Sequence, residues 1–178
     1  MDLHGRWLLL AILPWCLVPA FAGAPLLNET CLDRENKPVP TRYDPAATRF
    51  FAEARVLSAT ERREGLEKGV PPAAIYVNPE LYFLGQQTQQ WLFLRQCIHI
   101  QRDHLIAKAG ERGLRPEDEE QADCLALREL TRSPSQSSSM RTLRASIESD
   151  MERVLREDRW RQVLPGPQRR ISFDKCPG

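Results

Sequence analysis

The residues of this chain that could bind a metal ion or activate a water molecule lie in two segments. The first segment holds His99 and His104, and the second holds Glu119 and Asp123. Imidazole and carboxylate groups are the usual protein ligands of catalytic zinc, and a carboxylate is a common general base beside it. If the two segments met in one site, their residue types would suit metal-assisted hydrolysis.

The two segments together resemble the gluzincin metallopeptidases. Small exported bacterial members read His-Glu-Cys-x-His on one helix and Glu-x-x-Ala-Asp-Cys on the next. Here residues 95–99 read Arg-Gln-Cys-Ile-His, and residues 119–124 read Glu-Glu-Gln-Ala-Asp-Cys. Residues 75–79 also look like the substrate-edge strand of the family and its following turn. The similarity covers about residues 74–176.

The resemblance implies a role for each matching position. His99 matches the second zinc histidine, Glu119 the third zinc ligand, and Asp123 a carboxylate that supports a ligand. Arg95 replaces the first zinc histidine, and Gln96 replaces the catalytic glutamate. The resemblance therefore implies a peptidase scaffold with no catalytic residue and no resident metal.

The chemistry of the two replacements supports this implication. Arginine has no free lone pair and stays charged, so Arg95 cannot bind zinc and would repel a dication nearby. Glutamine cannot accept a proton at physiological pH, so Gln96 cannot activate water. We expect the Arg95 guanidinium to lie against Glu119 in place of the metal. We expect Asp123 to hydrogen-bond or pair with His99.

Two other interpretations remain open from the sequence. A residual zinc site would use His99 and Glu119 with Asp103 or His104. His104 lies about 140° around a helix from His99, so it could join only if the helix broke between them. The other interpretation is an exported structural domain without a metal, in which Arg95 and Glu119 are ordinary helix residues.

Four cysteines follow the N-terminal apolar segment: Cys31, Cys97, Cys124 and Cys176. In an exported protein they predict two disulfides, with three possible pairings. We expect Cys97–Cys124, which would join the two helices of the site, and Cys31–Cys176, which would join the two ends. A zinc knuckle fits less well because no two cysteines have C-x-x-C spacing.

The hydrophobic pattern predicts a mainly helical α+β domain with a small β element, held together by disulfides. The resemblance implies a gluzincin-like helical core with a short edge strand or hairpin. Apolar spacing and helix-capping residues predict helices, and a short apolar run between prolines predicts a strand. The predicted helices cover 45–58, 88–108 and 116–132 and continue with a fourth from 140, and the predicted strand covers 74–77.

Residues 1–22 are expected to be a signal peptide, with Ala20, Phe21 and Ala22 forming a small-x-small cleavage site. The remaining residues, 23–178, are expected to form a single metallopeptidase-like domain. Pro14 and Pro19 interrupt the apolar run, so cleavage is favoured over stable membrane insertion. The expected location is therefore the periplasm or the extracellular space.

A formal net charge of +1, with charged residues at 28%, gives no basic surface for nucleic acid. We therefore expect an exported, catalytically inactive metallopeptidase-like protein with no cofactor, zinc being the alternative. Its partner would be a peptide or protein, bound by strand addition in a groove beside residues 74–77.

Overall fold

The computed structural model describes residues 30–44, 51–61, 63, 72–105, 114–132, 139–157, 173 and 176. The predicted signal peptide lies outside these residues. The elements follow one another as β1 (Thr41–Tyr43), β2 (Ala52–Val56), β3 (Ala73–Val77), the 3-10 helix η1 (Pro79–Phe83), α2 (Gln86–Gln101), α3 (Pro116–Arg132) and α4 (Met140–Leu155). This arrangement confirms the mainly helical α+β class, with a small sheet and two disulfides.

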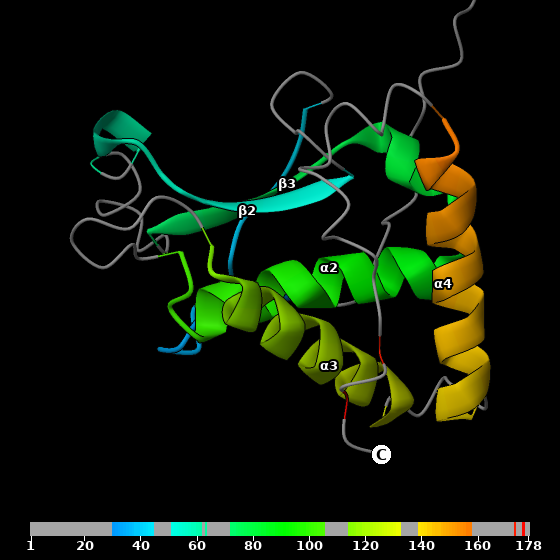
Figure 1. The fold of residues 1–178 in the computed structure, drawn as a ribbon. Helices are drawn as coiled ribbons and strands as arrows, with labels where there is room; N and C mark the ends of the chain where they lie inside the picture. Colours follow the sequence, from blue (N-terminus) through cyan, green and yellow to red (C-terminus); the bar gives the residue numbers. More distant parts are fainter. Residues whose placement is uncertain are drawn as a thin grey trace, which may run out of the picture.

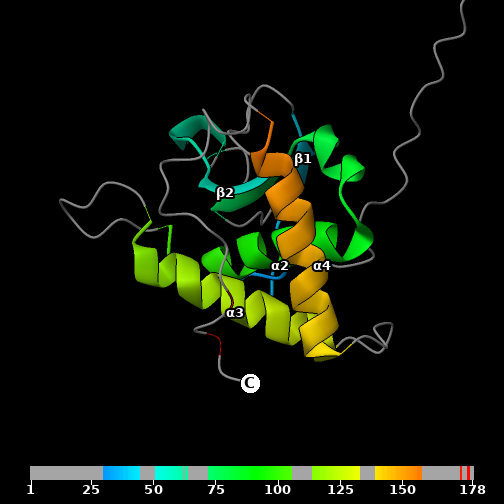
Figure 2. The same ribbon diagram turned by 45° about the vertical axis from the view of Figure 1, so that its right-hand side comes forward.

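The elements form layers around α2. The sheet covers one side of α2, α3 crosses on the other side, and α4 stands against one end (Figures 1 and 2). Buried apolar side chains from all of these elements form one core, including Ile75, Trp91, Leu127, Leu143 and Ile147. None of the helices in the described ranges is long and apolar enough to cross a membrane.

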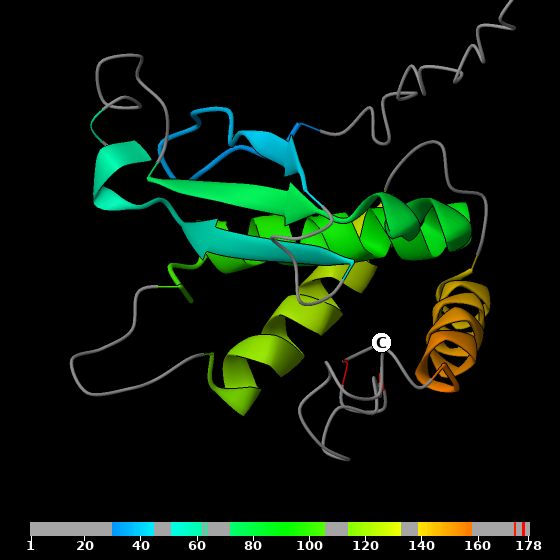
Figure 3. The same ribbon diagram turned by 90° about the horizontal axis from the view of Figure 1, so that it is seen from above.

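The sheet has the strand order β1-β3-β2, with β1 parallel and β2 antiparallel to β3 (Figure 3). The predicted strand at 74–77 is present as β3, but it is the central strand and not an edge. Because β3 has a neighbour on each side in the described sheet, a peptide cannot add directly to β3. The expected site of strand addition beside 74–77 is therefore wrong.

The predicted helix over 45–58 is also wrong where the structure describes it, because residues 52–56 form β2. Ala52 and Ala54 are buried, whereas Glu53 and Arg55 are half-buried on the opposite face. This period of two is that of a strand. The prediction rested on three apolar residues at helical spacing, and residues 45–50 lie outside the described ranges.

The predicted helices at 116–132 and from 140 are present as α3 and α4. The predicted apolar stripe of α4 faces the core through Leu143, Ile147, Met151 and Val154. The predicted helix over 88–108 is present as α2 but ends at Gln101. This early end matters for the site, because the residues that follow α2 turn back along it.

Asp150 of α4 fixes the beginning of α2. Its Oδ2 accepts hydrogen bonds from the Gly85 backbone N–H at 2.8 Å and from the Thr88 hydroxyl at 2.6 Å. Burial tends to raise the pKa of Asp150, but hydrogen bonds from Thr88, Arg153 and Gly85 outweigh it, so the pKa lies below its ordinary value. A Cβ at position 85 would lie 2.8 Å from Asp150 Oδ2, so a larger residue there would displace this carboxylate.

The predicted disulfide pairing is wrong. Cys31 is bonded to Cys97 with a Cα–Cα distance of 5.6 Å, and Cys124 is bonded to Cys176 with a Cα–Cα distance of 5.2 Å. The first bond holds the segment before β1 against α2. The second holds the C-terminal end against α3, where Phe173 packs edge-on against Trp91.

Helix geometry explains why Cys97 and Cys124 do not pair. Arg95 and His99 both face α3, as their contacts with Glu119 show. Cys97 lies two residues from each of them, which is about 200° around the helix. It therefore points away from α3 and toward the segment that carries Cys31.

Candidate functional site

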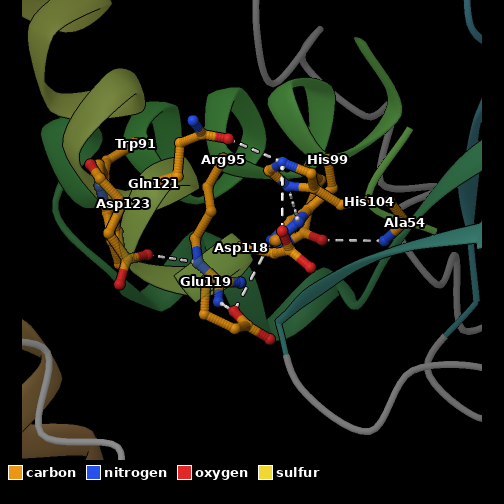
Figure 4. A network of polar contacts seen from close by, with 10 residues as sticks. Ala54, Trp91, Arg95, His99, His104, Asp118, Glu119, Gln121 and Asp123 are labelled. Atoms are coloured by element: carbon orange, nitrogen blue, oxygen red, sulfur yellow. Dashed lines mark hydrogen bonds and ion pairs between the residues drawn. The ribbon is translucent and has the colours of Figure 1, made fainter. Parts of the chain in front are cut away.

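The predicted site residues meet where α2 and α3 cross (Figure 4). Arg95 and His99 lie four residues apart on α2, and Glu119 and Asp123 lie four residues apart on α3, so each pair shares a helical face. The helices can approach closely here because Ala122, on the same side of α3, is small and fully buried.

Arg95 binds both carboxylates of α3. Its Nη2 contacts Glu119 Oε2, and its Nε donates to Asp123 Oδ1 at 2.5 Å. The three side chains are only 13%, 13% and 16% exposed, in the order Arg95, Glu119, Asp123. The contact predicted between Arg95 and Glu119 is thus present, and it is largely shielded from solvent.

A guanidinium suits this position for a physical reason. It is planar and presents several N–H donors in a fixed fork, so one side chain can serve two separate carboxylates. Two buried carboxylates without a cation would repel each other and lose their hydration. Arg95 supplies the positive charge that Glu119 and Asp123 require.

His99 is fully buried beside this cluster. Its Nε2 lies 3.7 Å from Glu119 Oε2, and its Nδ1 lies 3.1 Å from His104 Nδ1. Asp123, which was expected to pair with His99, is bound by Arg95. The Arg95 side chain lies between those of His99 and Asp123, and its Nε donates a hydrogen bond to Asp123 Oδ1 (Figure 4).

The end of α2 brings His104 to the site. After Gln101 the chain turns, Asp103 has a left-handed φ of 56°, and the His104 N–H donates to the His99 carbonyl at 3.0 Å. His104 Nε2 lies 2.9 Å from Gln121 Oε1. The helix break that a residual metal site would need is therefore present.

Asp103 takes no part in this cluster, because its carboxylate binds Arg34 at 2.5 Å. Asp118 does lie nearby, with Oδ1 3.8 Å from His104 Nε2. Arg115 donates two hydrogen bonds to Asp118, and these hold the pKa of Asp118 below its ordinary value, with a smaller effect from His104. The three-residue spacing of Arg115 and Asp118 at the start of α3 is the sequence signal that could have revealed this pair.

Gln96 makes a contact that the sequence did not suggest. Its Oε1 accepts a hydrogen bond from the Ala54 backbone N–H of β2 at 2.9 Å. Gln96 is 3% exposed, and its Nε2 has no hydrogen-bond partner in the part of the chain that the structure describes. The side chain that the resemblance matches to a general base is thus turned toward the sheet.

The donors at this site do not fit a zinc ion. The oxygen of Glu119 nearest His99 Nε2 is the one that Arg95 Nη2 contacts. A dication placed between His99 and Glu119 would lie against the guanidinium and be repelled. Within the described ranges, no group of three or more His, Cys, Asp or Glu side chains is placed to hold a metal ion.

No family model matches this chain, and neither a curated protein nor a solved structure matches it. The likeness to gluzincins therefore rests on the residues of α2 and α3.

Proposed function

We propose that this chain is an exported, metallopeptidase-like protein in which the Arg95 guanidinium stands in place of zinc. In this proposal the chain has lost catalysis and keeps the scaffold for binding a peptide or protein. One observation carries the proposal: Arg95 binds both Glu119 and Asp123 in a shielded position beside His99. The resemblance matches Glu119 to a zinc ligand, Asp123 to a supporting carboxylate and His99 to a second zinc ligand.

The loss of catalysis follows from two side chains. Zinc-dependent hydrolysis needs a metal-bound water and a base that takes its proton. Arg95 occupies the electrostatic position of the metal, and Gln96 cannot take a proton. Gln96 also has its Oε1 engaged by Ala54. A water molecule at this site would therefore have neither a metal ion to bind it nor a base to take its proton.

The disulfides support export. Disulfides form and persist in oxidising compartments, and the described part of the chain holds two. Together with the expected signal peptide at 1–22, they favour the periplasm or the extracellular space.

A residual metal site is the second candidate, and one observation favours it. His99 Nδ1 and His104 Nδ1 lie 3.1 Å apart, a separation that two nitrogen ligands of one metal ion could have. The close pair also has a simpler role, because one neutral imidazole can donate to the other.

Zinc titration of the mature, disulfide-intact protein separates the two candidates. We expect no binding at submicromolar zinc and no change in melting temperature with a chelator, because Arg95 already neutralises Glu119 and Asp123. Submicromolar binding by the wild-type protein would overturn the proposal. If that binding disappeared in His104→Ala, it would establish the residual site.

A further inference from the structure

Within the described residues β2 is an outer strand of the sheet, and its outer edge is the feature from which a further inference follows. The Leu57 N–H donates to the Pro72 carbonyl, and the Asn78 N–H donates to the Phe51 carbonyl, so hydrogen-bonded pairs flank the β2–β3 ladder at both ends. Hydrogen-bonded and non-bonded pairs alternate along an antiparallel ladder. Ala54 therefore directs its N–H and C=O away from β3, toward the edge.

Gln96 closes this edge at Ala54. Its Oε1 accepts from the Ala54 N–H at 2.9 Å, as the carbonyl of a neighbouring strand would. Both residues are buried. The contact is incomplete, however, because the buried Gln96 Nε2 has no hydrogen-bond partner in the described part of the chain. A buried donor without an acceptor destabilises the closed arrangement relative to one in which it is satisfied.

We infer that the Gln96 carboxamide is a latch on β2, and that an extended polypeptide pairs antiparallel with β2 by displacing it. The inference rests on the proposed function, since it names how the retained scaffold binds its partner. The incoming carbonyl replaces Gln96 Oε1 at the Ala54 N–H. The released carboxamide can then move, so that its Nε2 donates a hydrogen bond to another acceptor or to water.

The charges beside Ala54 indicate the chemistry of the partner. Glu53 and Arg55 flank Ala54 on the outer face of the sheet, where they are half-buried and bind each other at 2.8 Å. A strand added antiparallel and centred on Ala54 places one residue opposite each of them. A basic residue opposite Glu53 and an acidic residue opposite Arg55 complement the edge. Read along the partner, the order is acidic, small, basic.

Peptide binding to variants at position 96 tests the latch. The probe is a fluorescent heptapeptide with the sequence of residues 51–57, which has the required order, and the control peptide has its acidic and basic residues exchanged. Gln96→Leu introduces an apolar side chain of similar size and removes both the acceptor and the unsatisfied donor. We expect it to bind the probe about tenfold more tightly than wild type by fluorescence anisotropy.

Gln96→Glu is the matched control, because its carboxylate can still accept from the Ala54 N–H. We expect it to bind the probe no more tightly than wild type, because it keeps the acceptor and lacks the unsatisfied Nε2 donor. We expect all variants to bind the exchanged peptide more weakly. Amide exchange at Ala54 reports the latch directly. It should be slow in wild type and Gln96→Glu and faster in Gln96→Leu without peptide. Circular dichroism and melting temperature check that each variant is folded.

The inference is overturned by equal binding to wild type and folded Gln96→Leu, by equal binding of the two peptides, or by no binding to any variant. Dimerisation of Gln96→Leu without peptide, seen by light scattering, also overturns it, because the partner would then be a second copy of the chain. None of these outcomes changes the zinc titration, so failure of the latch is distinguishable from failure of the metal-free site.

Discussion

Replacing Arg95 with leucine is expected to lower the free energy of unfolding by about 3–5 kcal/mol. The reason is electrostatic. Arg95 is the cation in contact with both Glu119 and Asp123, and all three side chains are largely buried. Removing it leaves two carboxylates near each other in a poorly hydrated position, which costs more than the loss of the ion pair itself. Urea-induced unfolding followed by circular dichroism measures the change.

Arg34→Leu is the control for this prediction. Arg34 also pairs with a carboxylate, that of Asp103, but both groups are exposed. Solvent screens such pairs, so the expected loss is about 0–1 kcal/mol. If Arg95→Leu cost no more than Arg34→Leu, the buried cluster would not be the electrostatic unit that its geometry indicates.

Removing the disulfide between Cys124 and Cys176 is expected to cost about 4 kcal/mol on the chain-entropy model. The bond closes a loop with a sequence separation of 52 residues. It also holds the chain end whose Phe173 packs against Trp91 in the core. The double variant Cys124→Ala/Cys176→Ala should therefore unfold at lower urea than wild type, and its tryptophan fluorescence should change as Trp91 becomes more hydrated.

The matched control is Cys31→Ala/Cys97→Ala, which removes a bond of similar sequence separation, 66 residues, without releasing Phe173. It should lose a similar free energy while keeping the tryptophan signal of the folded state. Peptide mapping of the non-reduced wild-type protein tests the pairing itself. A fragment that joins Cys97 to Cys124 would contradict the structure.

The sequence predicted the parts of the fold that depend on local patterns. The helices α3 and α4 show apolar residues at helical spacing with clear start signals, and both are present as expected. The contact between Arg95 and Glu119 was predictable because the family pattern places those two positions at one metal ion. The prediction required only that the cation on α2 and the anion on α3 face each other.

Most of the remaining features depend on tertiary contacts that a local pattern does not contain. Ala54 is small enough to fit in either a helix or a strand, and its segment forms a strand because it pairs with β3. Cys97 lies two residues from Arg95 and from His99, which were expected to face α3, so helix geometry alone places it on the opposite side of α2. The predicted pairing with Cys124 did not take this into account. His104 reached the site only because Asp103 adopts a left-handed turn, which a non-glycine residue seldom does.

The role of Gln96 was missed for a related reason. A single buried glutamine gives no sequence signal of its partner, and its partner is a backbone N–H on a strand predicted as helix. At the position that the resemblance matches to a general base, the proposed replacement by glutamine has a structural consequence as well as a chemical one. It removes a proton acceptor and supplies an amide that closes the edge of the sheet.

The most direct test of the metal replacement is zinc binding by the double variant Arg95→His/Gln96→Glu. With the guanidinium gone, the imidazole introduced at position 95 would join His99 and Glu119 to complete the three protein ligands of a catalytic zinc site. Calorimetric titration of the folded variant, with both disulfides intact, should show one zinc ion per chain at submicromolar affinity, while wild type shows none. A folded double variant that binds no zinc would contradict the account, because α2 and α3 would then not be the two helices of a converted metallopeptidase site.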